Sequence, residues 1–356
     1  MNSNVKPPVG SVKTASKLKK LTLMGLIVTL GIVFGDIGTS PLYVMKAIAG
    51  ASGNFSDEYI IGAVSCVIWT LTLQTTVKYV LIALQADNKG EGGILALFAL
   101  LRKLPRKYLY IIAAIGASTL IADGIITPAI TVTSAVEGLN IISDSIPVIP
   151  IVLLIITGIF LMQRAGTGTI GKFFGPFMFT WFIMLGILGC FHIGDYHGIW
   201  YAFNPWYAIK LLIHSPEWFL ILGAVFLCTT GAEALYSDLG HCGKFNISVS
   251  WIFVKVMLIL NYLGQGAWMI AQGSEKVDGI NPFYGIMPGW FLIPGVIMST
   301  GAAIIASQAL LSGSFTIFSE AISLNFWPRL RIKYPSEEKG QLYIPVINWA
   351  LFVGCL

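Results

Sequence analysis

Three carboxylic acids lie inside long apolar stretches of this sequence, where charged side chains are rare. They are Asp36, Asp123 and Glu233. Even on a lenient insertion scale, an ionised Asp at the centre of a bilayer costs about 2.5–3.5 kcal/mol. Such groups persist where they face a water-filled cavity, pair with a cation or stay protonated. The three acids therefore predict an ion or proton path.

The residues around these acids favour a binding site. Asp36 lies within the segment GDIGTSP (35–41), whose two glycines and proline disfavour continuous helix. Glu233 follows the segment TTGA (229–232), where a single glycine is a weaker break. Interrupted helix at membrane depth is tolerated where its freed carbonyl groups line a cavity or bind a ligand.

A third group of polar residues shares one helical face. Asp123, Thr127 and Thr131 are spaced at i, i+4 and i+8, which stacks them along one stripe. Taken alone, the two threonines are also explained by hydroxyls that bond back to the carbonyl four residues earlier. Because they share a face with an acid, we interpret the stripe as a functional lining. Pro128 is expected to kink this helix and release a further carbonyl.

A buried ion pair is the structural alternative for the three acids. Within the spans only Lys78 and Lys255 could supply a cation, and two lysines cannot neutralise three acids. Both lie close to one predicted face of the membrane, where a lysine side chain reaches water. Carboxylate, hydroxyl and carbonyl oxygens suit a hard cation, and a large monovalent ion such as K+ fits this set better than Mg2+. The cysteines and histidines show no metal-binding spacing, and no cofactor is expected.

The composition identifies the elements that must position these side chains. Of the 356 residues, 56% are hydrophobic and only 11% are charged, less than half the share in a soluble domain. The mean hydropathy is +0.78. We therefore predict an all-α polytopic membrane protein, with a transmembrane domain at 21–320. Its eight complete spans are expected at 21–49, 59–85, 108–137, 147–163, 172–193, 217–240, 249–272 and 290–320.

The basic residues predict the orientation. Seventeen of the 22 Lys and Arg flank one side of the predicted membrane and three flank the other. We expect the protein in the plasma membrane. The asymmetry of basic residues predicts that the N-terminal tail (1–20) and the loop 321–342 lie in the cytoplasm. The net charge of +5 thus reflects the orientation of the chain in the membrane, and we expect no nucleic-acid partner. The first apolar run is too long for a signal peptide and is expected to be retained.

If the fold consists of five helices followed by five helices of inverted orientation, the first and sixth spans occupy corresponding positions in the two repeats. Paired interrupted segments are the best sequence indication of a midplane binding site in a secondary transporter. Under that condition, the interrupted spans one and six predict such a site, and the inverted-repeat fold itself is what the family resemblance described next implies.

Six motifs in chain order resemble the KUP/HAK/KT family of potassium uptake transporters. They are GDIGTSPLY (35–43), KGEGGI (89–94), ITPAI (126–130), GAEALY (231–236), NYLGQG (261–266) and IASQA (305–309). The resemblance implies an APC-superfamily (LeuT-like) fold and import of K+ together with H+. It implies K+ ligands at Asp36, Tyr43, Asp123, Thr127, Thr131, Thr230 and Glu233. The proton is expected on Glu233, Asp123 or Asp36, with Glu233 favoured.

The chain departs from that family at its end. A ninth span begins near Tyr343 and the segment 343–356 is too short to cross, so we expect the sequence to be C-terminally incomplete. Members of the family have twelve spans and a cytoplasmic C-terminal domain. The resemblance implies a homodimer formed through that domain, which this sequence does not include.

Other functions remain open from the residues alone. An amino-acid importer of the same fold would present half-helix amides to a carboxylate, which Asp36 would repel. A passive K+ channel would need rings of carbonyls or charges, and no TVGYG-like filter is present. No nucleophile or cofactor motif accompanies the acids, so the protein is not expected to be an enzyme. Alternating access of K+ to the two sides is the favoured mechanism.

Overall fold

The computed structural model describes residues 21–52, 55–88, 90–101, 108–143, 145–165, 168–277, 279–324, 326–334 and 342–356. The tail predicted to be cytoplasmic (1–20) lies outside the described residues, as do the five basic residues of the loop before the third span and part of the loop 321–342. Within the described ranges every regular element is helical, and the only β contacts are two isolated bridges.

Five long helical stretches form most of the molecule. They are α5 (Asp57–Thr70), continued by the π-helical η2 (Leu71–Ile82), then α7 (Tyr108–Glu137), α10 (Gly168–Ile193), α15 (Lys244–Gln272) and α18 (Leu292–Ser323). The shorter helices of the first half are α2 (Leu23–Ile32), α3 (Gly35–Thr39), η1 (Ser40–Leu42), α4 (Val44–Ser52), η3 (Ala83–Gln85), α6 (Ile94–Leu101), α8 (Leu139–Ile142), α9 (Val148–Met162) and η4 (Gln163–Ala165). Those of the second half are η5 (His197–Phe203), α11 (Pro205–His214), α12 (Trp218–Phe226), η6 (Leu227–Thr229), α13 (Ala234–Ser237), α14 (Leu239–Cys242), α16 (Ser274–Val277), α17 (Pro282–Gly285), η7 (Gly289–Phe291) and α19 (Pro345–Cys355).

The helices confirm a polytopic membrane protein. Six described helices are long and apolar enough to cross a bilayer, and a seventh span results if α2 and the segment Gly35–Leu42 are counted as one bent pair. The predicted fourth span is the short helix α9, with 15 residues, and the beginning of the predicted ninth is α19, with 11. Both fall below the roughly 20 residues that usually span. Six or seven spans are thus identified, where the sequence predicted eight.

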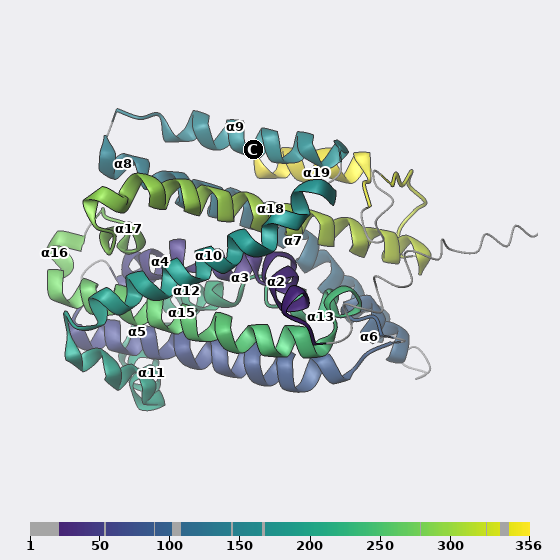
Figure 1. Cartoon of the computed structure of the whole chain (residues 1–356). Helices are drawn as coiled ribbons and strands as arrows, with labels where there is room; N and C mark the ends of the chain where they lie inside the picture. Colours follow the sequence, from purple (N-terminus) through teal and green to yellow (C-terminus); the bar gives the residue numbers. More distant parts are fainter. Residues whose placement is uncertain are drawn as a thin grey trace, which may run out of the picture.

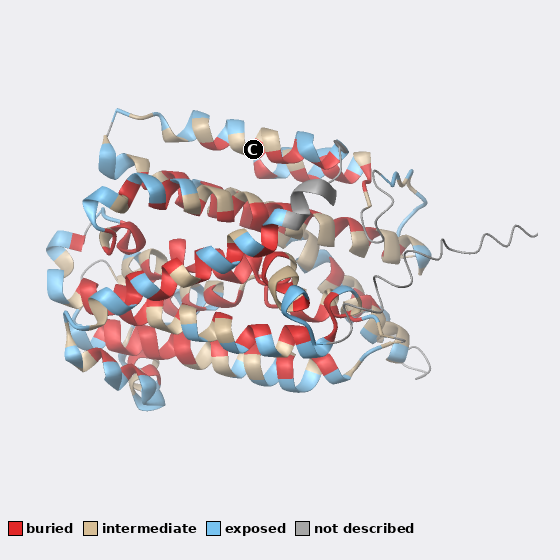
Figure 2. Cartoon of the chain, viewed as in Figure 1, coloured by how far each residue is buried: buried red, intermediate tan, exposed pale blue. Residues whose placement is uncertain are grey.

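The helices run roughly side by side and pack in layers (Figure 1). Along one side of the molecule α7 packs against α9, α18 and α19, and along the other α5 packs against α11, α12 and α15. Between them lie α10 and the short helices of the first span, which contact both α15 and α18. Buried residues concentrate on these inner elements, whereas the outer faces carry exposed apolar side chains (Figure 2). This pattern suits lipid on the outside of the bundle.

Glycines allow two pairs of helices to touch through their backbones. A Cβ atom on Gly189 of α10 would lie 2.2 Å from the Leu260 carbonyl oxygen of α15, and one on Gly264 would lie 2.4 Å from the Gly189 oxygen. Similarly, a Cβ on Gly31 of α2 would lie 2.6 Å from the backbone nitrogen of Gly175 in α10. Small residues at such crossings are what permits close helix packing in a membrane. The helices α2, α10 and α15 are joined in this way.

Replacing Gly189 by Ala is expected to destabilise the protein. The added methyl group would meet backbone, which cannot rotate away, so the cost of overpacking is about 1–3 kcal/mol. The thermal midpoint of the detergent-solubilised protein measures this loss. Gly158→Ala in α9 is the matched control, because nothing lies within 4 Å of its added Cβ. If both variants unfold at the temperature of the unmodified protein, the contact between α10 and α15 does not limit stability.

Candidate ion-binding site

The first predicted span is broken around Asp36. Helix α2 ends at Ile32, and the chain turns by 69° into the segment Gly35–Leu42. This segment forms one turn of α-helix and one turn of 3-10 helix, with Pro41 in its second half. The Thr39 hydroxyl donates to the Asp36 carbonyl oxygen at 2.8 Å. The interruption expected from the glycines and the proline is therefore confirmed.

Side-chain donors from other helices cap the carbonyl groups that this break exposes. The Trp181 indole donates to the Gly38 oxygen at 2.9 Å. The side-chain amides of Gln265 and Asn281 donate to the Pro41 and Leu42 oxygens, at 3.0 and 2.8 Å. Because buried carbonyls without partners are costly, these bonds let an irregular backbone remain inside the bundle. These hydrogen bonds also hold the interrupted segment, and with it Asp36, in a fixed orientation.

The sixth predicted span is broken just before Glu233. Helix α12 ends at Phe226, and Thr230 adopts an extended ψ of 132°. Gly231 follows with a φ of +83°, a conformation that residues with a side chain rarely adopt. Helix resumes at Ala234. The sequence signal here was one glycine, and the structure confirms a complete interruption.

The two breaks meet at Asp36 and Gly231. A Cβ atom on Gly231 would lie 2.6 Å from the Asp36 Cβ and 2.8 Å from its Oδ2. Asp36 is only 4% exposed, and neither of its carboxyl oxygens has a hydrogen-bond partner. A buried carboxyl group with both oxygens unsatisfied requires an explanation, and one is a bound ion. Gly231 thus gives the Asp36 carboxyl room that no other residue would leave.

The stripe on the third predicted span also faces inward. The Thr127 hydroxyl donates to Asp123 Oδ1 at 2.7 Å, and Asp123 Oδ2 is buried without a partner. Thr131 is fully buried, and its hydroxyl oxygen also lacks a partner. Neither threonine hydroxyl bonds to the backbone carbonyl four residues earlier, so that interpretation of these hydroxyls is wrong. The kink expected at Pro128 does not end the helix, because α7 runs continuously through that residue.

The three acids form one electrostatic cluster. Asp36 interacts with both Asp123 and Glu233, and Asp123 interacts with Glu233. No ion pair among the described residues includes any of them. The two candidate lysines lie elsewhere: Lys255 donates to the Thr76 hydroxyl at 3.2 Å, and Lys78 stacks on Tyr79 at 5.0 Å. A buried ion pair therefore does not account for the cluster.

Tyr43 and Thr230 complete the predicted set of seven residues. The Tyr43 hydroxyl lies 3.3 Å from the Ser40 hydroxyl and interacts with that of Thr230. Tyr43 is also electrostatically coupled to Asp36 and Asp123. The structure thus brings Asp36, Tyr43, Asp123, Thr127, Thr230 and Glu233 into one connected group. Thr131 lies one turn beyond Thr127 on the same helix, and its buried hydroxyl makes no hydrogen bond to this group.

A cavity adjoins this cluster. Asp36, Gly231, Glu233, Ser237 and Asp238 line one wall of it. The opposite wall comes from α18, including Ser314. No residue of α4 or α17 contributes to this cavity. Helix α13, which contributes to the lining, lies further to the right in Figure 1 than α4 and α17.

Sequence reasoning missed some polar residues behind the breaks. The Tyr262 hydroxyl is buried without a hydrogen-bond partner beside Tyr43 and Cys228. Gln265 is fully buried, and its amide oxygen lacks a partner as well. The signal that could have found them is simple, since both are polar residues one turn apart in an otherwise apolar span. The capping residues Trp181 and Asn281 carry no such signal in the sequence.

An all-helical membrane protein with two interrupted spans and a buried acidic cluster where they meet has the construction of a transport protein. The chain belongs to the family described as the K+ potassium transporter integral membrane domain, whose profile matches residues 23–356. This shows an integral membrane protein of that family and confirms the resemblance drawn from its motifs.

Similar proteins support the same assignment. The chain is 58% identical over 344 residues to a probable potassium transport system protein Kup of Cytophaga hutchinsonii, covering 95% of this chain and 52% of that protein. It is 55% identical over 344 residues to one from Lactococcus lactis, covering 94% and 51%. It is 50% identical over 359 residues to one from Clostridium perfringens, covering 96% and 54%. The chain spans about half the length of these curated relatives.

Proposed function

We propose that this chain forms the ion-binding part of a secondary active transporter that imports K+ together with H+ across the cell membrane. The observation that carries the proposal is the cluster of Asp36, Asp123 and Glu233 at the meeting point of two broken spans. These carboxyl groups are unpaired by lysine or arginine in the described part of the chain. The names of the relatives, which refer to potassium transport, favour K+ over an amino acid as the substrate.

The oxygens of the cluster suit a dehydrated K+ ion. Asp36, Tyr43 and Thr230 supply a carboxyl group and two hydroxyls from the two broken spans, and Asp123 with Thr127 and Thr131 supplies a parallel set from α7. An ion held between these groups satisfies the oxygens of Asp36 and Thr131 that otherwise have no partner. Potassium sheds its water readily onto such oxygens, because its hydration shell is weakly held compared with that of Mg2+.

Proton coupling follows from the crowding of negative charge. Three ionised carboxylates in one buried cluster repel one another, so protons and K+ compete to neutralise them. Glu233 is the favoured proton carrier because it lies both beside Asp123 and in the wall of the cavity. A proton on Glu233 leaves Asp36 and Asp123 to hold K+. Release of either ion then changes the affinity of the site for the other.

Alternating access is the proposed mechanism, in an APC-type arrangement of inverted repeats. In such an arrangement the first and sixth predicted spans would occupy corresponding positions, and the interruption of both spans supports it. With the N-terminus in the cytoplasm, the cavity residues Ser237 and Asp238 follow Glu233 toward the cytoplasmic side, which suits an inward-facing state. The bundle containing both broken spans then rocks to expose the cluster to the outside.

Uptake into proteoliposomes tests the proposed function. The protein is produced at the full length of its relatives, and 86Rb+ influx is followed with and without an imposed pH gradient, acidic outside. Accumulation against the Rb+ gradient that stops on adding a protonophore supports symport. Passive equilibration that is indifferent to the pH gradient would identify a channel instead.

Replacing Glu233 by Gln is expected to uncouple uptake from the pH gradient. Gln keeps the size of the side chain and cannot carry the proton. Gradient-driven 86Rb+ accumulation should fall at least tenfold, a change of about 1.4 kcal/mol, while exchange of Rb+ for K+ persists. Glu217→Gln is the matched control, since Glu217 is exposed at the start of the same span. Accumulation by Glu233→Gln with an unchanged pH dependence would show that another group carries the proton.

A further inference from the structure

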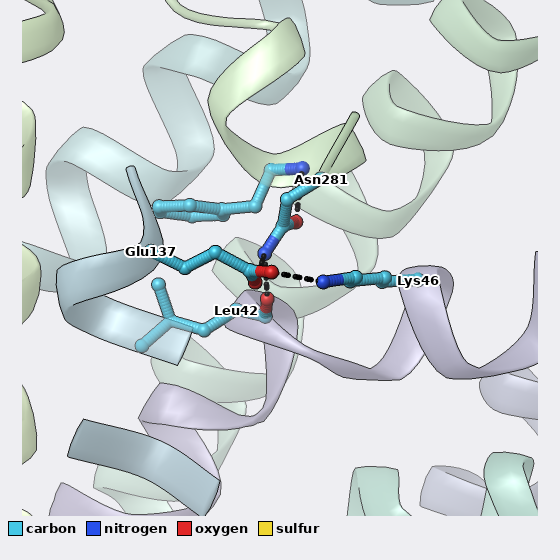
Figure 3. Close-up of polar contacts among 5 residues, drawn as sticks. Leu42, Lys46, Glu137 and Asn281 are labelled. Atoms are coloured by element: carbon cyan, nitrogen blue, oxygen red, sulfur yellow. Dashed lines mark hydrogen bonds and ion pairs between the residues drawn. The ribbon is translucent and has the colours of Figure 1, made fainter. Parts of the chain in front are cut away.

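A second polar cluster lies at the end of the bundle away from the cavity (Figure 3). Lys46 of α4 forms an ion pair with Glu137, the last residue of α7. The Asn281 amide, just before α17, donates to the Leu42 carbonyl oxygen at 2.8 Å and to Glu137 Oε2 at 3.4 Å. Leu42 directly precedes Tyr43 of the ion site. The cluster therefore joins the broken first span to two other helices.

Helix α4 is anchored on one side of this cluster. It packs against α12, the first half of the sixth predicted span. The buried Tyr59 hydroxyl of α5 donates to the Ile48 carbonyl oxygen at 2.9 Å. Helix α4 is thus attached to the broken sixth span and to α5, and it is expected to move with them.

Helix α17 is anchored on the other side. The Tyr284 hydroxyl donates to the Ala135 carbonyl oxygen of α7 at 2.6 Å and lies 2.8 Å from the Ser299 hydroxyl of α18. All three residues are buried. These bonds attach α17 to α7 and α18. The Lys46, Glu137 and Asn281 side chains consequently bridge these two groups of helices, which also meet where α4 contacts α17 and where α15 contacts both.

The bridge is more exposed than either anchor. The Lys46 and Glu137 side chains are 42% and 28% exposed, whereas Tyr59 and Tyr284 are buried. An ion pair that water reaches contributes little to stability and is screened by salt. When α4 moves relative to α7, the ion pair is therefore a contact that can break and re-form readily.

We propose that Lys46, Glu137 and Asn281 form a latch that closes this end of the transporter, and that Glu137 is a capture site for K+ whose place the Lys46 ammonium takes when the latch is shut. The proposal rests on the proposed function. Both cations are monovalent, and the carboxylate of Glu137 binds either. Once Lys46 withdraws, Glu137 and the neighbouring Leu42 carbonyl offer oxygens of the kind K+ prefers. External K+ thereby favours the open state by competing with Lys46.

The two halves of the latch give opposite kinetic predictions. Lys46→Gln removes the competing cation and is expected to lower the KM for external 86Rb+ about threefold or more. Glu137→Gln removes the capture site and is expected to raise that KM about threefold or more. A contact that only stabilised the fold would reduce the maximal rate in both variants and leave the KM unchanged. Shifts of KM in the same direction in the two variants would overturn the capture role.

The matched control is a second ion pair at the same end. Lys210 of α11 contacts Glu58 of α5 at 2.7 Å; Lys210 is as exposed as Lys46, and Glu58 is more exposed than Glu137. This pair joins helices on one side of the latch only. Lys210→Gln and Glu58→Gln are therefore expected to transport with the KM of the unmodified protein. A KM shift in these controls equal to that of the latch variants would mean that any surface charge at this end has the effect, which would overturn the proposal.

Cross-linking tests the movement directly. Cysteines replace Lys46 and Glu137 in a background in which the exposed Cys190 is replaced by Ala. A bifunctional, reducible thiol reagent then links the two cysteine sulfurs, which are further apart than a disulfide because cysteine is shorter than lysine and glutamate. We expect uptake to fall to background on cross-linking, to recover on reduction, and external K+ to slow the reaction. Full uptake by the cross-linked protein would refute the latch.

The proposed function and the latch fail in different ways. If the unmodified protein takes up no 86Rb+, potassium transport itself is refuted. If the unmodified protein and the Lys210 and Glu58 controls transport normally while both latch variants keep the same KM, only the latch is refuted.

Discussion

Replacing Asp36 by Asn is expected to abolish uptake of 86Rb+ by the full-length transporter. Asn has the shape of Asp without its charge, so the broken span keeps its geometry. The buried carboxyl group has no cation and no hydrogen-bond donor of its own, which leaves it free to bind the ion. Removing one partner of a buried charge pair costs about 2–5 kcal/mol. A loss of 3 kcal/mol corresponds to a factor of roughly 100 in binding.

The control for this prediction is an acid outside the cluster. Asp57 is exposed in the first turn of α5, and Asp57→Asn should transport normally. Asp123→Asn is expected to lose activity as Asp36→Asn does, with the added loss of the bond from Thr127. Undiminished uptake by both cluster variants, measured at equal amounts of folded protein in the membrane, would refute the site.

Replacing Gly231 by Ala is expected to have an effect as large, although Gly231 has no side chain with which to bind an ion. The left-handed backbone conformation costs a residue with a Cβ atom about 1–2 kcal/mol. The added methyl group would also overlap the Asp36 side chain, at 2.6 Å from its Cβ and 2.8 Å from its Oδ2. Either the break straightens or Asp36 is displaced. Uptake of 86Rb+ should fall to background while the protein still reaches the membrane.

Gly223→Ala in the preceding helix α12 provides the comparison. Nothing lies within 4 Å of its added Cβ, and Gly223 is in ordinary helix, so uptake should equal that of the unmodified protein. If Gly231→Ala transports as well as Gly223→Ala, the contact between the two broken spans does not position Asp36.

The location of the site could be predicted from the sequence because charge is expensive in lipid. Asp36, Asp123 and Glu233 are conspicuous in apolar spans, and the structure places them together. The break around Asp36 was also predictable, since two glycines and a proline act locally on the backbone. These are effects of composition and of short-range conformation, which a single sequence records directly.

The contacts that hold the site could not be predicted, because they are distant in the sequence. Gln265 caps the Pro41 carbonyl across 224 positions, and Asn281 caps that of Leu42 across 239. Nothing local indicates such a partner. The break before Glu233 was only partly foreseeable, because one glycine does not interrupt a helix unless the fold requires it. Whether Thr127 turns to Asp123 or to its own backbone is likewise decided by packing around α7.

The glycine contacts among α2, α10 and α15 limit how this protein can change shape. Where two helices touch backbone to backbone, no side chain lies between them that could switch rotamer to absorb a displacement. Sliding one helix by a fraction of a turn would replace each glycine by a bulkier neighbour at the crossing. The three helices are therefore a single mechanical part. Flexing during a transport cycle is consequently expected outside these contacts, and the irregular segments Val33–Phe34 and Thr230–Glu233 are candidates for it.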